Sequence, residues 1–227
     1  MTAVPIRSEN LFNQPMHVKN EIEEIRMLTF YSQERWNNWI NQVKESKFKI
    51  DPAAEGLGRE GIVFLDMEED VILALCKVTG KLQLGTITKE DAANNIQNMK
   101  EIVLAKVQPM DEDKDAMIES VQSSLVGAFA SAECFVAGDY DPKQKIEDLV
   151  LQAAKSEEAG DMDKVFELMG KAGALILAGK KFDSDKAYEK IPPESFVAEG
   201  VDGLDTIAAV LAGGIDYIDE ADEESDE

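Results

Sequence analysis

Apolar residues recur at helical spacing along most of the chain, and they predict helices rather than strands. Between residues 32 and 46, the sequence SQERWNNWINQVKES places its apolar side chains on one helical face. These residues are Trp36, Trp39, Ile40 and Val43. Asparagine and glutamine side chains fall on the other face, so the segment is predicted to form an amphipathic helix.

A glycine-rich segment, residues 47–62, separates this helix from the main body and is predicted to be a loop. Its stretch GLGREG, from Gly56 to Gly61, spells the GxGxxG fingerprint of dinucleotide-binding folds. That fingerprint requires a buried strand before it and a helix that opens within it. Here the apolar run IVFL follows the glycines instead. We therefore expect a flexible loop and no bound cofactor.

Capping signals locate the helices of the main body. Asp66, followed three residues later by Glu69, predicts the start of a buried helix over 67–83. Thr88 and Asp91 predict the start of a second helix, which extends to about residue 107 and forms a hairpin with the first. Further helices are predicted over 112–137, 142–158, 162–178 and 200–218. The first of these is lined with small residues and is expected at the centre of the bundle.

The near copies AGDYDP and AGDMDK are predicted to join the end of one helix to the start of the next. Gly138 and Gly160 suit left-handed C-terminal caps, while Asp141 and Asp161 suit the N-caps that follow. A calcium-binding EF-hand loop requires a central glycine and a glutamate at its twelfth position, and neither copy supplies them. The aspartates therefore predict helix boundaries and no metal site.

The amino-acid composition argues against two classes of binding partner, nucleic acids and anionic membranes. The net charge is −23, from 46 acidic against 23 basic residues. This balance disfavours direct binding to nucleic acid and to anionic membrane surfaces, which both require clustered lysine and arginine. No apolar stretch approaches the roughly 20 residues that cross a bilayer, and the N-terminus lacks the apolar centre of a secretory signal. We expect a cytoplasmic protein.

Candidate catalytic chemistry is sparse. His17 is the only histidine, which argues against a Cys/His zinc site and a histidine-dependent hydrolytic triad. Cys76 and Cys134 lie far apart, outside any CxxC motif, and are expected to be free thiols. Carboxylates are abundant, but spacing alone cannot single out an acid/base pair among them. The sequence therefore predicts no catalytic, cofactor-binding or metal-binding residue.

Two segments can present themselves to a partner protein. The tryptophan helix, residues 32–46, fits a core-facing role because helical aromatic stripes usually pack inward, but tryptophan is also enriched at interfaces. The final run DEADEESDE is predicted to be disordered and able to contact a basic surface. The candidate partner-binding residues are Trp36, Trp39, Ile40, Val43, Asp222, Glu223 and Glu224.

The run FYSQERWNNWINQV from Phe30, with GTITKEDA at 85–92, resembles the start of an uncharacterised family of small acidic proteins from methanogenic and related archaea. The resemblance covers chiefly the first helix and the hairpin, and it implies an archaeal cytoplasm without supplying a catalytic residue. The family pattern begins near TFYSQERW. The residues before it are therefore either a variable extension or lie upstream of a start at Met27.

These observations predict an all-α bundle of six or seven mostly antiparallel helices with short connections. The expected organisation is an N-terminal extension over 1–28, a helical domain over 29–218 and an acidic tail over 219–227. The expected function is that of a non-catalytic interaction protein, an accessory or assembly subunit of a larger archaeal enzyme complex. Two alternatives stay open: a small-ligand binder or enzyme with an interhelical carboxylate pocket, and a ribosome-associated factor.

Overall fold

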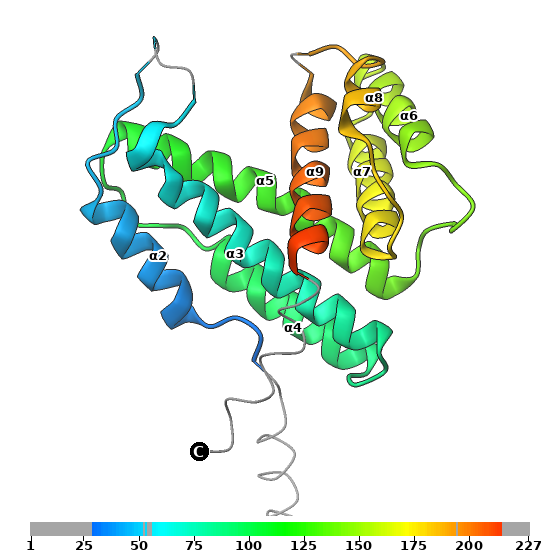
Figure 1. Ribbon diagram of the computed structural model, residues 1–227, viewed down its shortest axis with the longest axis horizontal. Coiled ribbons are helices and arrows are strands. Elements are labelled where there is room, and N and C mark those ends of the chain that lie inside the picture. The colour runs from blue at the N-terminus through cyan, green and yellow to red at the C-terminus, as the bar shows by residue number, and fades with distance from the viewer. Residues whose placement is uncertain (1–28, 52, 54–55, 194, 215–227) are drawn as a thin grey trace, which may run out of the picture.

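The structure, a computed structural model, describes residues 29–51, 53, 56–193 and 195–214. All regular secondary structure in that part of the chain is helical, which confirms the predicted all-α bundle (Figure 1). The helices are α2 (Gln33–Glu45), α3 (Gly58–Gln83), α4 (Lys89–Val103), α5 (Glu112–Ala137), α6 (Ile146–Glu158), α7 (Met162–Leu177), α8 (Ser184–Tyr188) and α9 (Phe196–Gly214). The predicted extension over 1–28 and the predicted tail over 219–227 lie outside the described residues.

Helix α5 runs through the middle of the molecule, as its small residues predicted. It packs against α3, α4, α7 and α9, and its Leu125 and Phe129 side chains are fully buried. Small side chains allow α7 to come close. A Cβ atom added at Gly173 of α7 would lie 2.0 Å from the Ser131 Oγ of α5, so only glycine fits at that crossing.

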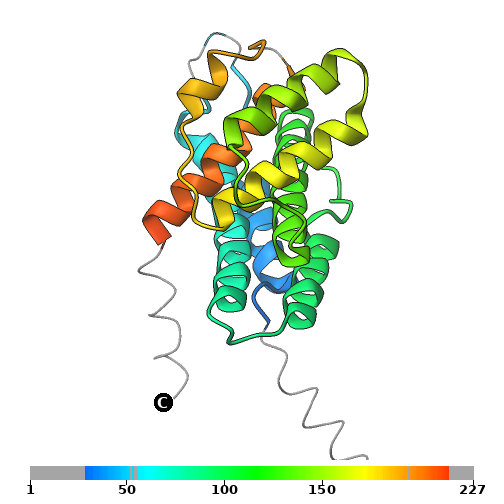
Figure 2. The same cartoon turned by 90° about the vertical axis from the view of Figure 1, so that its right-hand side faces the viewer.

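The helices form two groups around α5. Helices α2, α3 and α4 lie on one side, and α6, α7, α8 and α9 on the other, as the two perpendicular views show (Figures 1 and 2). Helix α9 packs on α7 and also returns to α3 and α5. The last described helix therefore joins the two groups, and one hydrophobic core extends through both.

Local capping signals were accurate where the cap and helix are close in sequence. Thr88 caps α4 through a capping box, in which the Asp91 N–H donates to the Thr88 hydroxyl at 3.1 Å and the Asp91 carboxylate accepts from the Thr88 N–H at 3.0 Å. Gly138 and Gly160 both adopt a φ of 76° after their helices. Asp161 caps α7 by accepting a hydrogen bond from the Lys164 N–H at 3.1 Å. These boundaries confirm the predictions.

The predicted start of α3 was wrong. The helix begins at Gly58 and not near residue 67, so Asp66 and Glu69 lie inside it and the end of the predicted loop over 47–62 is helical. The apolar repeat begins earlier than the capping signal indicated. Phe64 packs edge-on against Phe48, with ring centroids 5.0 Å apart, and this contact buries the first turns of the helix.

Three other boundaries differ from prediction. Helix α6 begins at Ile146 and not at 142, because Asp141 forms a separate turn in which its carboxylate accepts from the Lys143 N–H at 2.9 Å. Helix α4 ends at Val103, short of the predicted residue 107. Helix α9 begins at Phe196, four residues before the predicted start. The short helix α8 was not predicted.

Candidate partner-binding site

The tryptophan helix α2 turns part of its predicted binding face into the core. Trp36 and Val43 are 2% and 0% exposed, so the chain itself covers both side chains. Trp39 and Ile40 are half-buried and pack against the edge of the core. The helix therefore offers to solvent only the outer parts of Trp39 and Ile40, next to a polar face of asparagine and glutamine.

A polar cluster fastens α2 to α3. The Asp70 carboxylate of α3 accepts a hydrogen bond from the Trp39 indole Nε1 at 2.7 Å and from Arg35 Nε at 2.9 Å, and a second guanidinium nitrogen of Arg35 completes a bidentate ion pair. The Arg35 guanidinium also lies 5.2 Å from the centre of the Tyr31 ring. Burial, reinforced by the Asp70 charge, raises the pKa of Tyr31. Arg35 and Trp39 thus hold the helix in place.

The acidic candidates Asp222, Glu223 and Glu224 lie outside the described residues, and their role stays a prediction. Within the ranges that the structure describes, no group of three or more His, Cys, Asp or Glu side chains is arranged to hold a metal ion. Cys76 and Cys134 are free thiols, as predicted.

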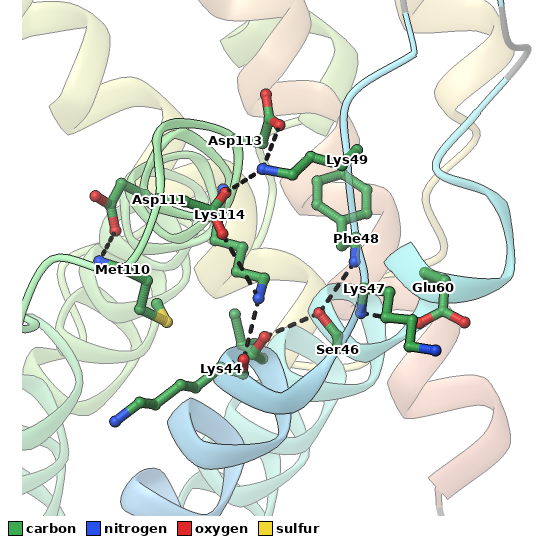
Figure 3. A network of polar contacts seen from close by, with 12 residues as sticks. Lys44, Ser46, Lys47, Phe48, Lys49, Glu60, Met110, Asp111, Asp113 and Lys114 are labelled. Atoms are coloured by element: carbon green, nitrogen blue, oxygen red, sulfur yellow. Dashed lines mark hydrogen bonds and ion pairs between the residues drawn. The ribbon is translucent and has the colours of Figure 1, made fainter.

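Charged side chains join the end of α2 to the start of α5 beside the glycine-rich stretch (Figure 3). Lys49 Nζ lies 2.9 Å from Asp111 Oδ1 and 3.1 Å from Asp113 Oδ2. The hydrogen bond from Lys49 lowers the pKa of Asp111. Lys114 is buried and donates to the backbone carbonyl of Lys44 at 3.0 Å, which satisfies a carbonyl at the end of α2. This network has a structural role.

A pocket of about 390 Å³ lies beside this network, over the start of α3. Helix α3 opens within GLGREG, as the dinucleotide fingerprint requires, but residues 47–51 before it form no strand. Three basic residues of the lining, Lys47, Lys49 and Arg59, bring positive charge to the pocket. Asp51 and Glu60 of the lining oppose it, and Lys49 is paired with the aspartates of α5. The residues that line it are Lys47, Phe48, Lys49, Ile50, Asp51, Gly56, Leu57, Gly58, Arg59, Glu60 and Met117.

One carboxylate lies half-buried between two helices. Glu68 of α3 accepts a hydrogen bond from the Ser124 hydroxyl of α5. Burial raises the pKa of Glu68, and the nearby charges of Glu69 and Asp202 raise it further. Glu68 lines neither of the two pockets described for this chain. Glu68 is thus an interhelical carboxylate, and the ligand pocket of the alternative hypothesis stays a prediction.

Exposed apolar side chains gather where α7 and α9 begin. Phe166 and Phe196 meet edge to face with ring centroids 5.1 Å apart, although both rings are about two-fifths exposed. Met162 precedes Phe166 by one helical turn and is 36% exposed. We call these three residues, Met162, Phe166 and Phe196, the apolar patch. Sequence reasoning missed the patch because Phe166 and Phe196 are brought together only by the packing of two helices.

A carboxylate positions the second phenylalanine of the patch. Glu157, at the end of α6, accepts hydrogen bonds from the backbone N–H groups of Phe196 at 2.7 Å and of Val197 at 3.0 Å. It therefore caps α9 from another helix. Beside this contact lies a second pocket of about 450 Å³, lined by Ala154, Glu157, Glu158, Pro192, Pro193 and Ser195.

A family model described as an uncharacterized protein conserved in archaea (DUF2150) matches residues 29–220. The chain belongs to the DUF2150 family. No curated protein and no solved structure matches it. The family assignment confirms the resemblance seen in the tryptophan helix and the following hairpin.

Two further features of this DUF2150 chain concern its helices and its surface. None of the helices in the described residues is long and apolar enough to span a bilayer. The apolar patch, by contrast, lies wholly within the stretch that matches the family model. The patch, its neighbouring pocket and the outer edge of α2 are three exposed features of this surface.

Proposed function

We propose that this DUF2150 chain is a non-catalytic protein-interaction protein, an accessory or assembly subunit of a larger enzyme complex in the archaeal cytoplasm. The observation that carries the proposal is the apolar patch. Large apolar side chains that remain exposed side by side are typical of protein-binding surfaces, whereas isolated ones are ordinary. Phenylalanine and methionine are also enriched at interfaces. The patch therefore supports a role in binding another protein.

The segments predicted from sequence contribute to the proposal in different ways. Trp36 and Val43 support α2 from inside, while the outer edges of Trp39 and Ile40 stay candidates for contact. The acidic tail with Asp222, Glu223 and Glu224 stays a candidate for contact with a basic surface. In this proposal the apolar patch is the main contact and these segments are secondary.

Purification from the native cell tests this proposal. The tagged full-length chain should retain one protein partner at fixed stoichiometry, and chemical cross-links should connect that partner to Lys164 of α7. The double variant Phe166→Ala/Phe196→Ala should lose the partner. Leu84→Ala is the matched control, because Leu84 is an apolar residue that is 68% exposed at the end of α3. This variant should retain the partner.

The same preparation distinguishes the alternatives. A wild-type chain that elutes alone, at the molar mass of a monomer, contradicts the interaction role. Co-sedimentation with ribosomes would instead favour the ribosome-associated factor. A small molecule that copurifies with an otherwise isolated chain would favour the ligand binder, and the pocket at the start of α3 would be the first place to map it.

A further inference from the structure

The apolar patch is bordered by acidic side chains. Asp163 and Glu199 are exposed, and each lies one helical turn from a phenylalanine of the patch. Lys164 is two residues beyond Met162, which places it on the opposite face of α7, where it bonds Glu167 at 2.8 Å. Helix α9 contains no basic residue. The rim of the patch is therefore negative.

The pocket beside the apolar patch also combines apolar and acidic side chains. Pro192 and Pro193 supply apolar walls, and Ser195 connects the pocket directly to Phe196 of the patch. The carboxylate of Glu157 is occupied by the first backbone N–H groups of α9. Glu158 is exposed and makes no hydrogen bond or ion pair in the part of the chain that the structure describes. An apolar-walled pocket with an available carboxylate suits a lysine or arginine side chain.

Resting on the proposed function, we propose that the patch and this pocket together bind an amphipathic basic segment of a partner protein. Its apolar side chains cover Phe166 and Phe196, and a lysine or arginine enters the pocket beside Glu158. Covering the rings removes apolar surface from water, while the acidic rim attracts the basic side chains and orients the segment. This pairing resembles the way a helix binds in a groove.

Charge argues against other occupants. Residues 191–227 contain twelve acidic residues and no basic residue, so the end of this chain would be repelled by the rim of the patch. A second copy of the chain, docked patch to patch, would bring Asp163 and Glu199 of both copies together. The observed charges therefore favour a different chain with basic residues.

Peptide titration of the full-length chain tests the inference. The probe is a fluorescein-labelled, 14-residue helical peptide with leucine at i, i+3, i+4 and i+7 and lysine on the remaining face, followed by fluorescence anisotropy. Phe166→Ala/Phe196→Ala should weaken binding by about tenfold or more. Asp163→Asn/Glu199→Gln should weaken it about threefold and reduce its dependence on salt. Circular dichroism should show unchanged helicity in each variant.

Matched controls separate a site from general charge attraction. Glu90→Gln/Glu101→Gln removes two exposed charges from α4 and should leave binding unchanged, as should Leu84→Ala. A peptide with glutamate in place of lysine should bind at least tenfold more weakly. Equal losses in the α4 and rim variants, or equal binding of both peptides, would overturn the inference.

Two further outcomes separate this inference from the proposed function. If light scattering shows a dimer that Phe166→Ala/Phe196→Ala dissociates, the patch is a self-interface and the inference is wrong. If the native partner is retained by that variant, the interaction role stands and this inference is again wrong. If the basic peptide binds the patch selectively although no native partner is retained, the chemistry inferred for the patch holds and the proposed role in a complex fails.

Discussion

Single residues at the helix crossings decide how closely the helices of this bundle approach. Gly173 and Gly127 both lie within helices, yet their surroundings differ completely. A Cβ atom at Gly173 would meet Ser131 Oγ at 2.0 Å and Ser131 Cβ at 2.5 Å, whereas one at Gly127 would meet nothing within 4 Å. The same substitution should therefore have opposite effects at the two positions.

We expect Gly173→Ala to lower the free energy of unfolding by about 1–3 kcal/mol, because the added methyl group forces α5 and α7 apart. Gly127→Ala should raise it by about 0.5–1 kcal/mol, because alanine restricts the unfolded chain and suits a helix. Urea unfolding followed by circular dichroism measures both. The combination Gly173→Ala/Ser131→Gly should recover part of the loss, and equal effects at both positions would contradict this packing.

The half-buried carboxylate of Glu68 links stability to pH. Its pKa is raised above the ordinary value of 4.5, chiefly by burial, so the folded state holds the proton more tightly than the unfolded state. The stability that this protonation contributes is complete below about pH 4.5 and is lost as pH rises through the raised pKa. At neutral pH the charged form is a cost to the fold.

Replacing this carboxyl group with an amide should therefore stabilise the protein selectively. Glu68→Gln should require a higher urea concentration for unfolding than wild type at pH 7, and the difference should shrink toward pH 4. The measurement is a series of urea titrations between pH 4 and pH 8. A difference that is constant across the series would show that Glu68 does not titrate as the geometry implies.

At the scale of elements, α9 depends on a cap that another helix supplies. Glu157 of α6 accepts the first backbone N–H groups of α9, at Phe196 and Val197. Glu157→Ala should cost about 1 kcal/mol, and Glu157→Gln should cost less because its carbonyl can still accept. Hydrogen exchange should report faster opening of α9 amides, while α4 amides should keep their protection relative to global unfolding. Uniform loss of protection across both helices would contradict a local cap.

The helix boundaries show which helix starts a short sequence pattern can predict and which depend on distant contacts. Thr88 and Asp91 are three residues apart and predicted the start of α4 correctly. The start of α9 depends on Glu157, 39 residues before Phe196, and no short sequence pattern contains such a cap. At α3, Asp66 and Glu69 predicted a start inside the helix, because the packing of Phe64 against Phe48 continues the helix upstream to Gly58.

The candidate site was predictable only in part, for the same reason. The apolar spacing of α2 identified its helix, but spacing could not say that Trp36 and Val43 face the core or that Asp70 accepts the indole N–H of Trp39. Phe166 and Phe196 lie in different helices, and only tertiary packing makes them one surface. The periodicity of a sequence identifies the apolar face of each helix. A patch that two helices share can be identified only when the packing of those helices is known.

At the scale of the whole molecule, an excess of like charge opposes the compact state. The acidic side chains behind the net charge of −23 lie closer together in the folded chain than in an extended one, so they repel one another more strongly there. We expect the midpoint of thermal unfolding to rise by a few degrees as sodium chloride increases from about 50 to about 500 mM, because the Debye length shortens. Sucrose at equal osmolality is the control. A midpoint that falls with salt would mean that attractive ion pairs dominate.

Helix α9 packs against α3 and α5. Both of these helices are synthesised well before α9. Until residue 214 has been synthesised, the faces of α3 and α5 that α9 later covers stay open to water. Domains whose elements all emerge early can bury their cores during synthesis. This bundle can complete its core only after its last described helix has been made. A nascent chain of this protein should thus leave apolar helix faces available to chaperones, and its final folding step should follow emergence of α9.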